Sequence, residues 1–296
     1  MHVTVNNIRL FFDVEGAKLV PDGPKLREMP TLLCLHGGPG LDHSTLKPVF
    51  SSLADVAQVI YLDQRGHGRS DRSSREHWTL AQWADDVREF CHVLGIENPI
   101  VLGISFGGYV AMTYAIRYPD HPAKLVLMST ALRGTGNPVR RQRVLDMFEQ
   151  LGGLEARETM RRAFDDRSQE AFADFLQVCG PLYTRRSDPD ARARTISNTG
   201  IVPFFERAEG EGVTFDYQKD LSVVRCPTLV IGGEDDPMTP ITEMEEIIRA
   251  LPSGLAIFEK IPDCGHGIYR DAPERLVRLL REFLGVCEVE TARMQI

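Results

Sequence analysis

The sequence predicts an α/β fold in which a mostly parallel central sheet is flanked by helices and carries a helical insertion. Short apolar runs that end in turn residues alternate with amphipathic stretches of helical period, which is typical of parallel sheets built from strand–helix–strand units. This alternation stops over residues 131–221, where only short helical patterns occur. A chain of 296 residues is long enough for one large domain with such an insertion.

The N-terminal part predicts a β-hairpin that leads into the sheet. Two strand-like runs, HVTV and IRLFFDV, flank Asn6 and Asn7, a pair that tolerates positive φ in a tight turn. A polar loop is predicted over residues 16–30. The apolar runs at 31–35 and 57–62 are typical of strands that are covered on both faces. We therefore expect the parallel part of the sheet to begin near residue 31.

A helix is predicted over residues 79–94, because apolar residues recur there at spacings of three and four. Its apolar face contains Leu80, Trp83, Val87, Phe90, Cys91 and Leu94. The remaining predicted elements are strands at residues 100–104, 124–129, 227–233 and 255–261 and a closing helix at 273–284.

Two domains are predicted: a core of residues 1–130 and 222–296, and a helical cap of residues 131–221. The cap contains amphipathic runs such as VLDMFEQL and AFADFLQV. A helical insertion at this point predicts a lid over the carboxyl edge of the sheet, where ligands bind in such folds. We expect a group of cap arginines to form a solvated face: Arg140, Arg141, Arg143, Arg161 and Arg162.

The composition argues against several classes of partner. A net charge of -8 leaves no basic surplus for nucleic acid or an anionic membrane. No run approaches the roughly 20 apolar residues that span a bilayer, and the N-terminus lacks a signal-peptide pattern. The cysteines are scattered without a CxxC pair, so we expect reduced thiols and a cytoplasmic protein. We expect a small-molecule substrate, no metal and no cofactor, and nothing in the sequence predicts an oligomeric state.

The pattern G-x-S-x-G at residues 103–107 is the strongest chemical signal. It follows an apolar strand and opens an apolar helix, the context of a nucleophile elbow. Such a tight turn requires small residues two positions before and after the serine, here Gly103 and Gly107. The helix N-terminus would stabilise negative charge on Ser105. The alternative, a glycine-rich turn with an incidental serine, is disfavoured by the flanking strand and helix.

A second motif, HGGPG at residues 36–40, directly follows a predicted strand. Glycines such as Gly37 let backbone N–H groups approach a ligand. In a fold with this kind of elbow, the loop supplies one oxyanion donor and the residue after the nucleophile supplies the other. We therefore assign the amides of Gly38 and Phe106 to an oxyanion hole. We expect His36 to have a structural role in the loop.

A serine needs a histidine base to become a good nucleophile, and a carboxylate orients that base. In this kind of fold the chain order is serine, acid, histidine. Of the histidines, His266 follows Ser105 on a loop after a predicted strand. His121 lies in a helix-to-strand connection, and His67 precedes the serine. His266 is therefore the predicted base.

Three adjacent carboxylates, EDD, follow the next-to-last predicted strand and compete for the role of the acid. Asp236 precedes a proline, which restricts its backbone to extended conformations and directs its side chain reproducibly. This argument favours Asp236 over Asp235, which we expect to be solvated or to cap a turn. The other possible acid position carries Ser129 and Thr130 and so has no carboxylate.

The motifs HGGPG, DQRGHGRSD, GISFGG, GEDDPMTP and CGHG together resemble the α/β-hydrolase superfamily, and in particular its proline iminopeptidase-like branch. The resemblance covers the core domain, about 200 residues, and implies the α/β-hydrolase fold with the triad Ser105, Asp236 and His266. It also supports Asp236, because the acid of the family stands three residues after the glycine at Gly233 and four before the proline at Pro240.

Two features depart from the proline iminopeptidase pattern. That branch usually has GGSWGS at the elbow, where this chain has GISFGG. The branch also carries lid glutamates for the substrate amine, and Ser197 stands where we would look for one. A cationic amine in a closed pocket needs a fixed carboxylate partner. Glu206, Glu209 and Glu211 are candidates, although the run EGEG is typical of an exposed loop.

The sequence therefore predicts a serine hydrolase that cleaves a carboxylic ester, lactone or amide of a small molecule through an acyl-enzyme intermediate. A proline iminopeptidase-like aminopeptidase is one alternative. A ligand-binding protein that uses the same fold without turnover is the other.

Overall fold

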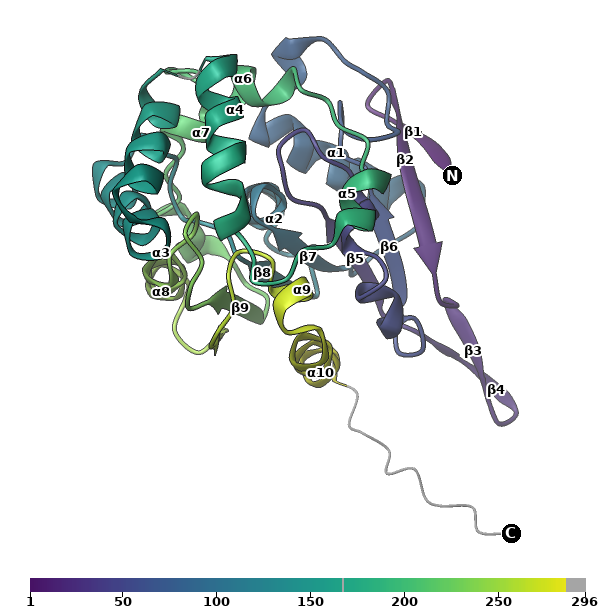
Figure 1. Ribbon diagram of the computed structural model, residues 1–296. Coiled ribbons are helices and arrows are strands. Elements are labelled where there is room, and N and C mark those ends of the chain that lie inside the picture. The colour runs from purple at the N-terminus through teal and green to yellow at the C-terminus, as the bar shows by residue number, and fades with distance from the viewer. Residues whose placement is uncertain (167, 286–296) are drawn as a thin grey trace.

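The computed structural model describes residues 1–166 and 168–285 of the chain. An eight-stranded sheet lies at its centre with helices packed on both faces (Figure 1). The strands of this sheet are β1 (His2–Val5), β2 (Ile8–Glu15), β5 (Thr31–Leu35), β6 (Gln58–Leu62), β7 (Ile100–Ile104), β8 (Lys124–Met128), β9 (Thr228–Gly233) and β10 (Ala256–Ile261). β3 (Leu19–Asp22) and β4 (Lys25–Glu28) form a separate two-stranded sheet.

The order of strands in the large sheet is β1-β2-β6-β5-β7-β8-β9-β10. All neighbouring strands from β6 to β10 in this order pair in parallel. β1 pairs with β2, and β2 with β6, in antiparallel fashion. The predicted α/β fold with a mostly parallel sheet is therefore confirmed. The carboxyl ends of the parallel strands share one edge, which is where ligands bind in open α/β sheets.

The helices divide between the two faces of the sheet and the region between β8 and β9. Those packed on the sheet are α1 (Leu80–Val93), α2 (Phe106–Arg117), α8 (Ile241–Ala250), α9 (Ile268–Asp271) and α10 (Pro273–Leu284), with the short 3₁₀ helices η1 (His43–Leu46) and η2 (Phe50–Leu53). α1, α2 and α8 cover one face, while η2, α9 and α10 cover the other. The predicted helices at 79–94 and 273–284 are confirmed within a residue at each end.

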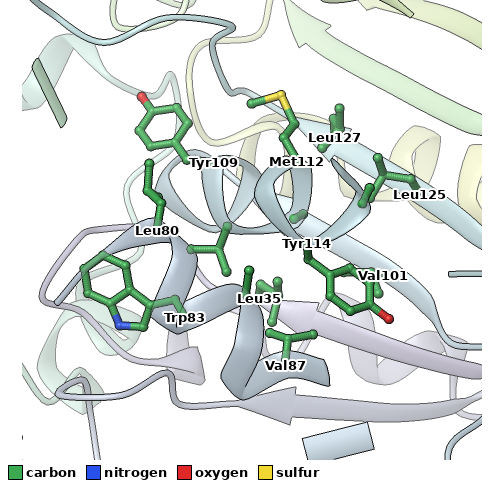
Figure 2. Close-up of a cluster of buried hydrophobic side chains, with 14 of the residues drawn as sticks. Leu35, Leu80, Trp83, Val87, Val101, Tyr109, Met112, Tyr114, Leu125 and Leu127 are labelled. Carbon is green, nitrogen blue, oxygen red and sulfur yellow. The ribbon is translucent and has the colours of Figure 1, made fainter. Parts of the chain in front are cut away.

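Alternation of side chains along each strand builds a separate apolar core on each face. In β5, Leu33 and Leu35 join the core beneath α1 and α2, while Leu32 and Cys34 join the core beneath α10. Figure 2 shows the first of these cores, in which Trp83 lies near strand residues such as Leu35. Because the strands are buried on both faces, they are apolar throughout, which explains why these runs lack alternation in the sequence.

The N-terminal hairpin is confirmed, with Asn6 and Asn7 at φ 45° and 62° in its turn. The prediction of a loop over residues 16–30 is wrong in part, because β3 and β4 pair as a second hairpin there. Its turn contains Gly23 at φ 59°. β3 and β4 are mostly exposed and project from the body (Figure 1), so they lack the apolar period that would have revealed them.

The helical insertion (residues 131–221) contains α3 (Pro138–Asp165), α4 (Gln169–Val178), η4 (Gly180–Leu182), α5 (Pro189–Arg194), α6 (Ile201–Phe205), α7 (Glu211–Thr214) and η5 (Asp220–Val223). It lies between β8 and β9, where the sequence predicted an all-helical segment. In Figure 1, α3, α4, α6 and α7 gather beside one end of the sheet. Their own apolar cluster includes Phe148, Phe164 and Phe175.

Arg140 is buried, which corrects the expectation of a fully solvated arginine face. Its exposed fraction is 2%, and its Nη2 donates to the hydroxyl of Tyr109 at 3.0 Å. A further nitrogen of Arg140 donates to the carbonyl of Arg133. Arg143 forms an ion pair with the buried carboxylate of Glu243 at 2.9 Å. The other three arginines of this group are partly exposed and pair with carboxylates of the insertion: Arg141, Arg161 and Arg162.

Five cysteines among the described residues are buried free thiols, and Cys287 lies outside the described residues. Burial raises the pKa of Cys264, Cys179 and Cys226 to about 11, so these thiols stay protonated at neutral pH. Within residues 1–166 and 168–285, no helix is both long and apolar enough to cross a membrane.

Candidate active site

Ser105 stands at the turn between β7 and α2 in a strained conformation, with φ 53° and ψ −117°. A Cβ added to Gly103 would lie 2.4 Å from the carbonyl oxygen of Gly107. A Cβ added to Gly107 would lie 2.2 Å from the carbonyl oxygen of Leu35. Only glycine fits at both positions, as predicted from the G-x-S-x-G pattern. Strain of this kind at a non-glycine residue is typical of functional sites.

Gly108 is a third glycine that the elbow requires, and it was not singled out in the sequence. A Cβ at this position would lie 2.4 Å from Oγ1 of Thr130. That hydroxyl donates to the carbonyl oxygen of Ser105 at 2.8 Å and so supports the turn. The pair Gly107-Gly108 was the sequence signal that could have identified this position. Thr130 stabilises the elbow, a role that the sequence did not predict.

His266 and Asp236 meet Ser105 across the carboxyl edge of the sheet, on loops that follow β10 and β9. Nε2 of His266 lies 3.0 Å from Oγ of Ser105. Nδ1 of His266 lies 3.0 Å and 2.9 Å from the two carboxylate oxygens of Asp236. These distances allow a continuous hydrogen-bonded relay from serine to carboxylate. The structure thus brings together the three residues that the sequence predicted as nucleophile, base and acid.

The Asp236 carboxylate is fully buried and its orientation is fixed by its own loop. Oδ1 accepts hydrogen bonds from the backbone N–H groups of Met238 and Thr239, both at 2.9 Å, and Oδ2 accepts from the Thr239 hydroxyl at 2.6 Å. The neighbouring Asp235 points elsewhere and forms an ion pair with Arg185 of the helical insertion. The choice of Asp236 over Asp235 therefore agrees with the geometry, and the role of Asp236 as the acid stays a prediction.

The HGGPG loop after β5 lies directly against the serine. A Cβ added to Gly37 would lie 3.4 Å from Cβ of Ser105. Gly38 adopts φ 138° and precedes a cis peptide bond to Pro39. Phe106 is the first residue of α2, so its N–H belongs to the unpaired first turn of the helix. The assignment of the Gly38 and Phe106 amides to an oxyanion hole stays a prediction.

His36 and His67 are buried beneath this loop and hold it in place. Nδ1 of His36 lies 2.8 Å from the Gly37 carbonyl, and its Nε2 accepts from the Gln64 N–H at 3.3 Å. These contacts require a neutral imidazole, and burial lowers the pKa of His36. The His67 ring stacks on Phe106 at 5.3 Å, and burial lowers its pKa to about 3. These contacts agree with the structural role expected of His36, which stays a prediction, and His67 packs on Phe106 in the same cluster.

The helical insertion covers the other side of His266. The phenol ring of Tyr183 packs edge-on against the imidazole, and its carbonyl accepts the His266 backbone N–H at 2.6 Å. Burial raises the pKa of Tyr183 well above its ordinary value, and the charges of Asp236 and Glu206 raise it further. Tyr183 is therefore a neutral group at this site. Its position in a turn of the insertion gave no sequence signal.

Tyr109, on α2 one turn after Ser105, extends toward the insertion. Figure 2 places its hydroxyl away from the sheet residues, and Arg140 donates to that hydroxyl at 3.0 Å. Burial raises the pKa of Tyr109, Arg140 lowers it, and the charge of Glu206 raises it again. Tyr109, Tyr183 and Glu206 therefore lie close enough to interact electrostatically. Neither tyrosine was identified from the sequence.

The three glutamates proposed as amine ligands occupy different environments. Glu209 is exposed. Glu211 accepts from the Leu80 N–H at the start of α1, and burial raises its pKa. Glu206 is half-buried and accepts from the Thr135 hydroxyl at 3.1 Å. The expectation of an exposed loop over the run EGEG is therefore wrong in part, because Glu211 is partly buried. Of the three glutamates, Glu206 lies close enough to Tyr109 and Tyr183 to raise the pKa of both.

Comparison with known families gives one model that matches residues 30–273, described as the alpha/beta hydrolase fold. The match begins just before β5 and ends at the start of α10, so it includes the elbow, the HGGPG loop and the loops that carry Asp236 and His266. It also spans the helical insertion between β8 and β9.

Several known proteins are similar to the chain over most of its length. The proline iminopeptidase PfmaB of Pestalotiopsis fici is 28% identical over 284 residues, covering 93% of this chain and 98% of that protein. The putative carbamate hydrolase RutD of Caulobacter sp. is 26% identical, and the match covers 84% of this chain and 94% of that protein. Among solved structures, a proline iminopeptidase of Mycobacterium smegmatis superposes with a TM-score of 0.77 at 23% identity, covering 96% and 97%. A thermophilic esterase from Thermogutta terrifontis has a TM-score of 0.64 at 26% identity, covering 96% and 98%.

Proposed function

Because the chain belongs to the alpha/beta hydrolase fold family, we propose that it is a serine hydrolase that cleaves a carboxylic ester, lactone or amide bond of a small molecule. The observation that carries this proposal is the relay from Ser105 through His266 to Asp236, with a 3.0 Å contact at the serine. A nucleophile on a strained elbow, a base within hydrogen-bond reach and a buried carboxylate are what acyl transfer requires.

In the first step, Nε2 of His266 accepts the proton of the Ser105 hydroxyl while Oγ attacks the carbonyl carbon of the substrate. The amides of Gly38 and Phe106 donate to the oxyanion of the tetrahedral intermediate. The protonated His266 then gives its proton to the leaving alcohol or amine as the bond to the carbonyl carbon breaks. The acyl group remains on Ser105, and Asp236 stabilises the imidazolium throughout.

In the second step, His266 accepts a proton from water, and the resulting hydroxide attacks the acyl ester on Ser105. The bond between Oγ and the carbonyl carbon breaks, and Oγ recovers its proton from His266. The carboxylic acid product leaves and the enzyme returns to its starting state. The helical insertion acts as a lid in this proposal, because Tyr183 covers the imidazole through which every proton passes.

Ser105-dependent turnover is the direct test. The wild-type protein should hydrolyse a short-chain p-nitrophenyl ester and react with a fluorophosphonate probe at Ser105. Ser105→Ala should lose several orders of magnitude in kcat and all labelling while its circular dichroism stays unchanged. A Ser105→Ala variant that keeps more than about a tenth of the activity would contradict the proposal. A folded wild-type protein with no turnover and no labelling would instead favour the binding-protein alternative.

A second candidate is an aminopeptidase that removes N-terminal proline. The half-buried Glu206 favours it, because this carboxylate lies close enough to Tyr183, which packs on His266, to raise the pKa of the phenol, and a carboxylate there can pair with a substrate amine. The similarity to proline iminopeptidases points the same way. Proline p-nitroanilide and the p-nitrophenyl ester separate the two candidates. Strong Ser105-dependent release from the anilide supports the aminopeptidase, and release from the ester alone supports an esterase or lactonase.

A further inference from the structure

A strap of the helical insertion (residues 183–186) lies directly against the histidine loop (residues 262–267). The His266 N–H donates to the Tyr183 carbonyl at 2.6 Å. A Cβ added to Gly265 would lie 2.3 Å from that same carbonyl oxygen. A Cβ added to Gly267 would lie 2.5 Å from Cγ2 of Thr184. The two segments therefore pack backbone to backbone, and glycines in the histidine loop permit this approach.

A single carboxylate, that of Asp271, holds the two segments together. Its Oδ1 accepts from the backbone N–H groups of Arg185 and Arg186 in the strap, both at 3.0 Å. Its Oδ2 accepts from the backbone N–H of Gly265 in the histidine loop at 2.8 Å. Asp271 is 9% exposed and ends the short helix α9. An ionised carboxylate that bridges N–H groups in this way makes strong, directional hydrogen bonds.

The position of His266 is consequently fixed from two sides. Asp236 holds the imidazole at Nδ1, and the strap holds the main chain of the same residue through Tyr183. Without Asp271, three backbone N–H groups lose their shared acceptor, and the strap can move away from the histidine loop. A displacement of the imidazole by a fraction of an ångström would lengthen the 3.0 Å contact between Nε2 and Ser105.

We propose that Asp271 is a positioning residue for the catalytic histidine, and that it acts by clamping the strap of the helical insertion onto the histidine loop. This inference rests on the proposed function, because it assigns Asp271 a task in the same Ser105–His266 chemistry. It also couples the insertion to catalysis, since any opening that lifts the strap removes the acceptor of the His266 N–H.

Asp271→Asn is the informative variant. An amide has one acceptor oxygen, so it can serve either the strap or Gly265, and its NH₂ group would face the other N–H. The matched control is Asp263→Asn, which removes one negative charge from an exposed position in the same loop. Asp263 has φ 56°, a conformation that asparagine tolerates well.

The readouts are kcat per active site, counted by fluorophosphonate titration, and the rate constant of labelling. Both are independent of the fraction of protein that is folded. Asp271→Asn should lower both by about 10- to 100-fold, the effect of a small misplacement of a catalytic group, with a much smaller change in KM. Asp263→Asn should leave both at the wild-type level.

A purely structural role for Asp271 would overturn the proposal. In that case Asp271→Asn would lower the melting temperature and the number of titratable sites, while kcat per site stayed at the wild-type value. If Asp271→Asn yields no folded protein, Gly265→Ala tests whether the contact between strap and histidine loop matters for catalysis. Its Cβ would push the Tyr183 carbonyl away while Asp271 stays intact. Unchanged kcat per site in Gly265→Ala would also overturn the proposal. Activity retained by Ser105→Ala would instead refute the proposed function itself.

Discussion

The phenol ring of Tyr183 stands edge-on against the imidazole of His266, with ring centres 5.4 Å apart and an angle of 83° between the planes. Tyr183 belongs to the helical insertion, whereas His266 follows the last strand of the sheet. The contact shields one side of the imidazole from water and restricts its rotation. Edge-to-face aromatic pairs of this kind contribute roughly 0.5–1.5 kcal/mol beyond simple burial.

Removal of this ring should slow the reaction without abolishing it. We expect Tyr183→Ala to lower kcat by about 2- to 10-fold, the rate equivalent of one aromatic pair, and Tyr183→Phe to keep most of the activity. Phe172→Ala is a suitable control, because it removes an aromatic ring from an exposed position of α4. Equal losses in Tyr183→Phe and Tyr183→Ala would assign the effect to the hydroxyl group rather than to the ring.

Gly107→Ala should destabilise the elbow. The added Cβ would meet the backbone carbonyls of Leu35 and His36 at 2.2 Å and 2.6 Å, and neither is a flexible side chain that can turn away. We expect the free energy of unfolding to fall by about 1–3 kcal/mol or more, with loss of Ser105 labelling. Urea denaturation measures the first effect. Gly180→Ala is the control, because a Cβ there meets nothing within 4 Å and should leave labelling unchanged.

The sequence predicted most of the sheet and the placement of the chemical groups, because these depend on local patterns. Buried parallel strands are continuous apolar runs, and each ends in a loop that carries a polar motif. Chain order, together with a position on a loop after a predicted strand, selected His266, and the proline after Asp236 favoured that residue over Asp235. The contact distances among Ser105, His266 and Asp236 agree with this selection.

The contacts of the helical insertion could not be predicted, because they join residues that are distant in sequence and carry no motif. Tyr183 meets His266, and Asp271 meets the strap, only once the insertion has folded over the sheet edge. The burial of Arg140 was missed for a related reason. Its partner Tyr109 lies on the helix after the elbow, and nothing in a run of arginines distinguishes a buried member from exposed ones.

The same substitution should have very different effects on stability at Arg140 and at Arg161. Arg140→Met removes a buried cation. The Tyr109 hydroxyl and the Arg133 carbonyl lose a hydrogen-bond donor, and Glu243 loses a nearby positive charge. The loss of hydrogen bonds from this buried, charged donor should cost about 1.5–3 kcal/mol of stability. Arg161→Met removes exposed pairs with Glu158 and Asp165 and should cause no measurable change. Chemical denaturation of both variants checks this, and similar values would contradict the burial of Arg140.

Glu206→Gln should separate recognition of an amine from ester hydrolysis. If Glu206 pairs with a substrate ammonium group, its loss should lower kcat/KM for proline p-nitroanilide by about tenfold or more, since a charged partner contributes roughly 1.5–3 kcal/mol. Hydrolysis of the p-nitrophenyl ester, which has no amine, should be unaffected. Glu209→Gln, at an exposed position nearby, is the control. A uniform loss with both substrates would assign Glu206 a structural role through Thr135.

The buried His67 should make the protein less stable in mild acid. Burial lowers its pKa from 6.5 to about 3 in the folded state, so between these values the unfolded chain binds a proton that the folded chain does not. Stability must therefore be fully present above pH 6.5 and must fall as the pH drops toward 3. One such group changes the free energy of unfolding by up to about 1.4 kcal/mol per pH unit.

His67→Asn isolates this contribution, because an asparagine side chain does not titrate. Its amide can still donate to the Arg65 carbonyl, which Nδ1 of His67 contacts at 2.8 Å. Urea denaturation of both proteins between pH 7 and 4.5 gives the dependence on pH directly. The wild-type protein should lose stability more steeply than His67→Asn, whatever the absolute stability of the variant. Subtracting the two curves cancels the titration of groups that are distant from His67. Parallel curves would mean that His67 is protonated in the folded protein, which its stacking on Phe106 and its burial argue against.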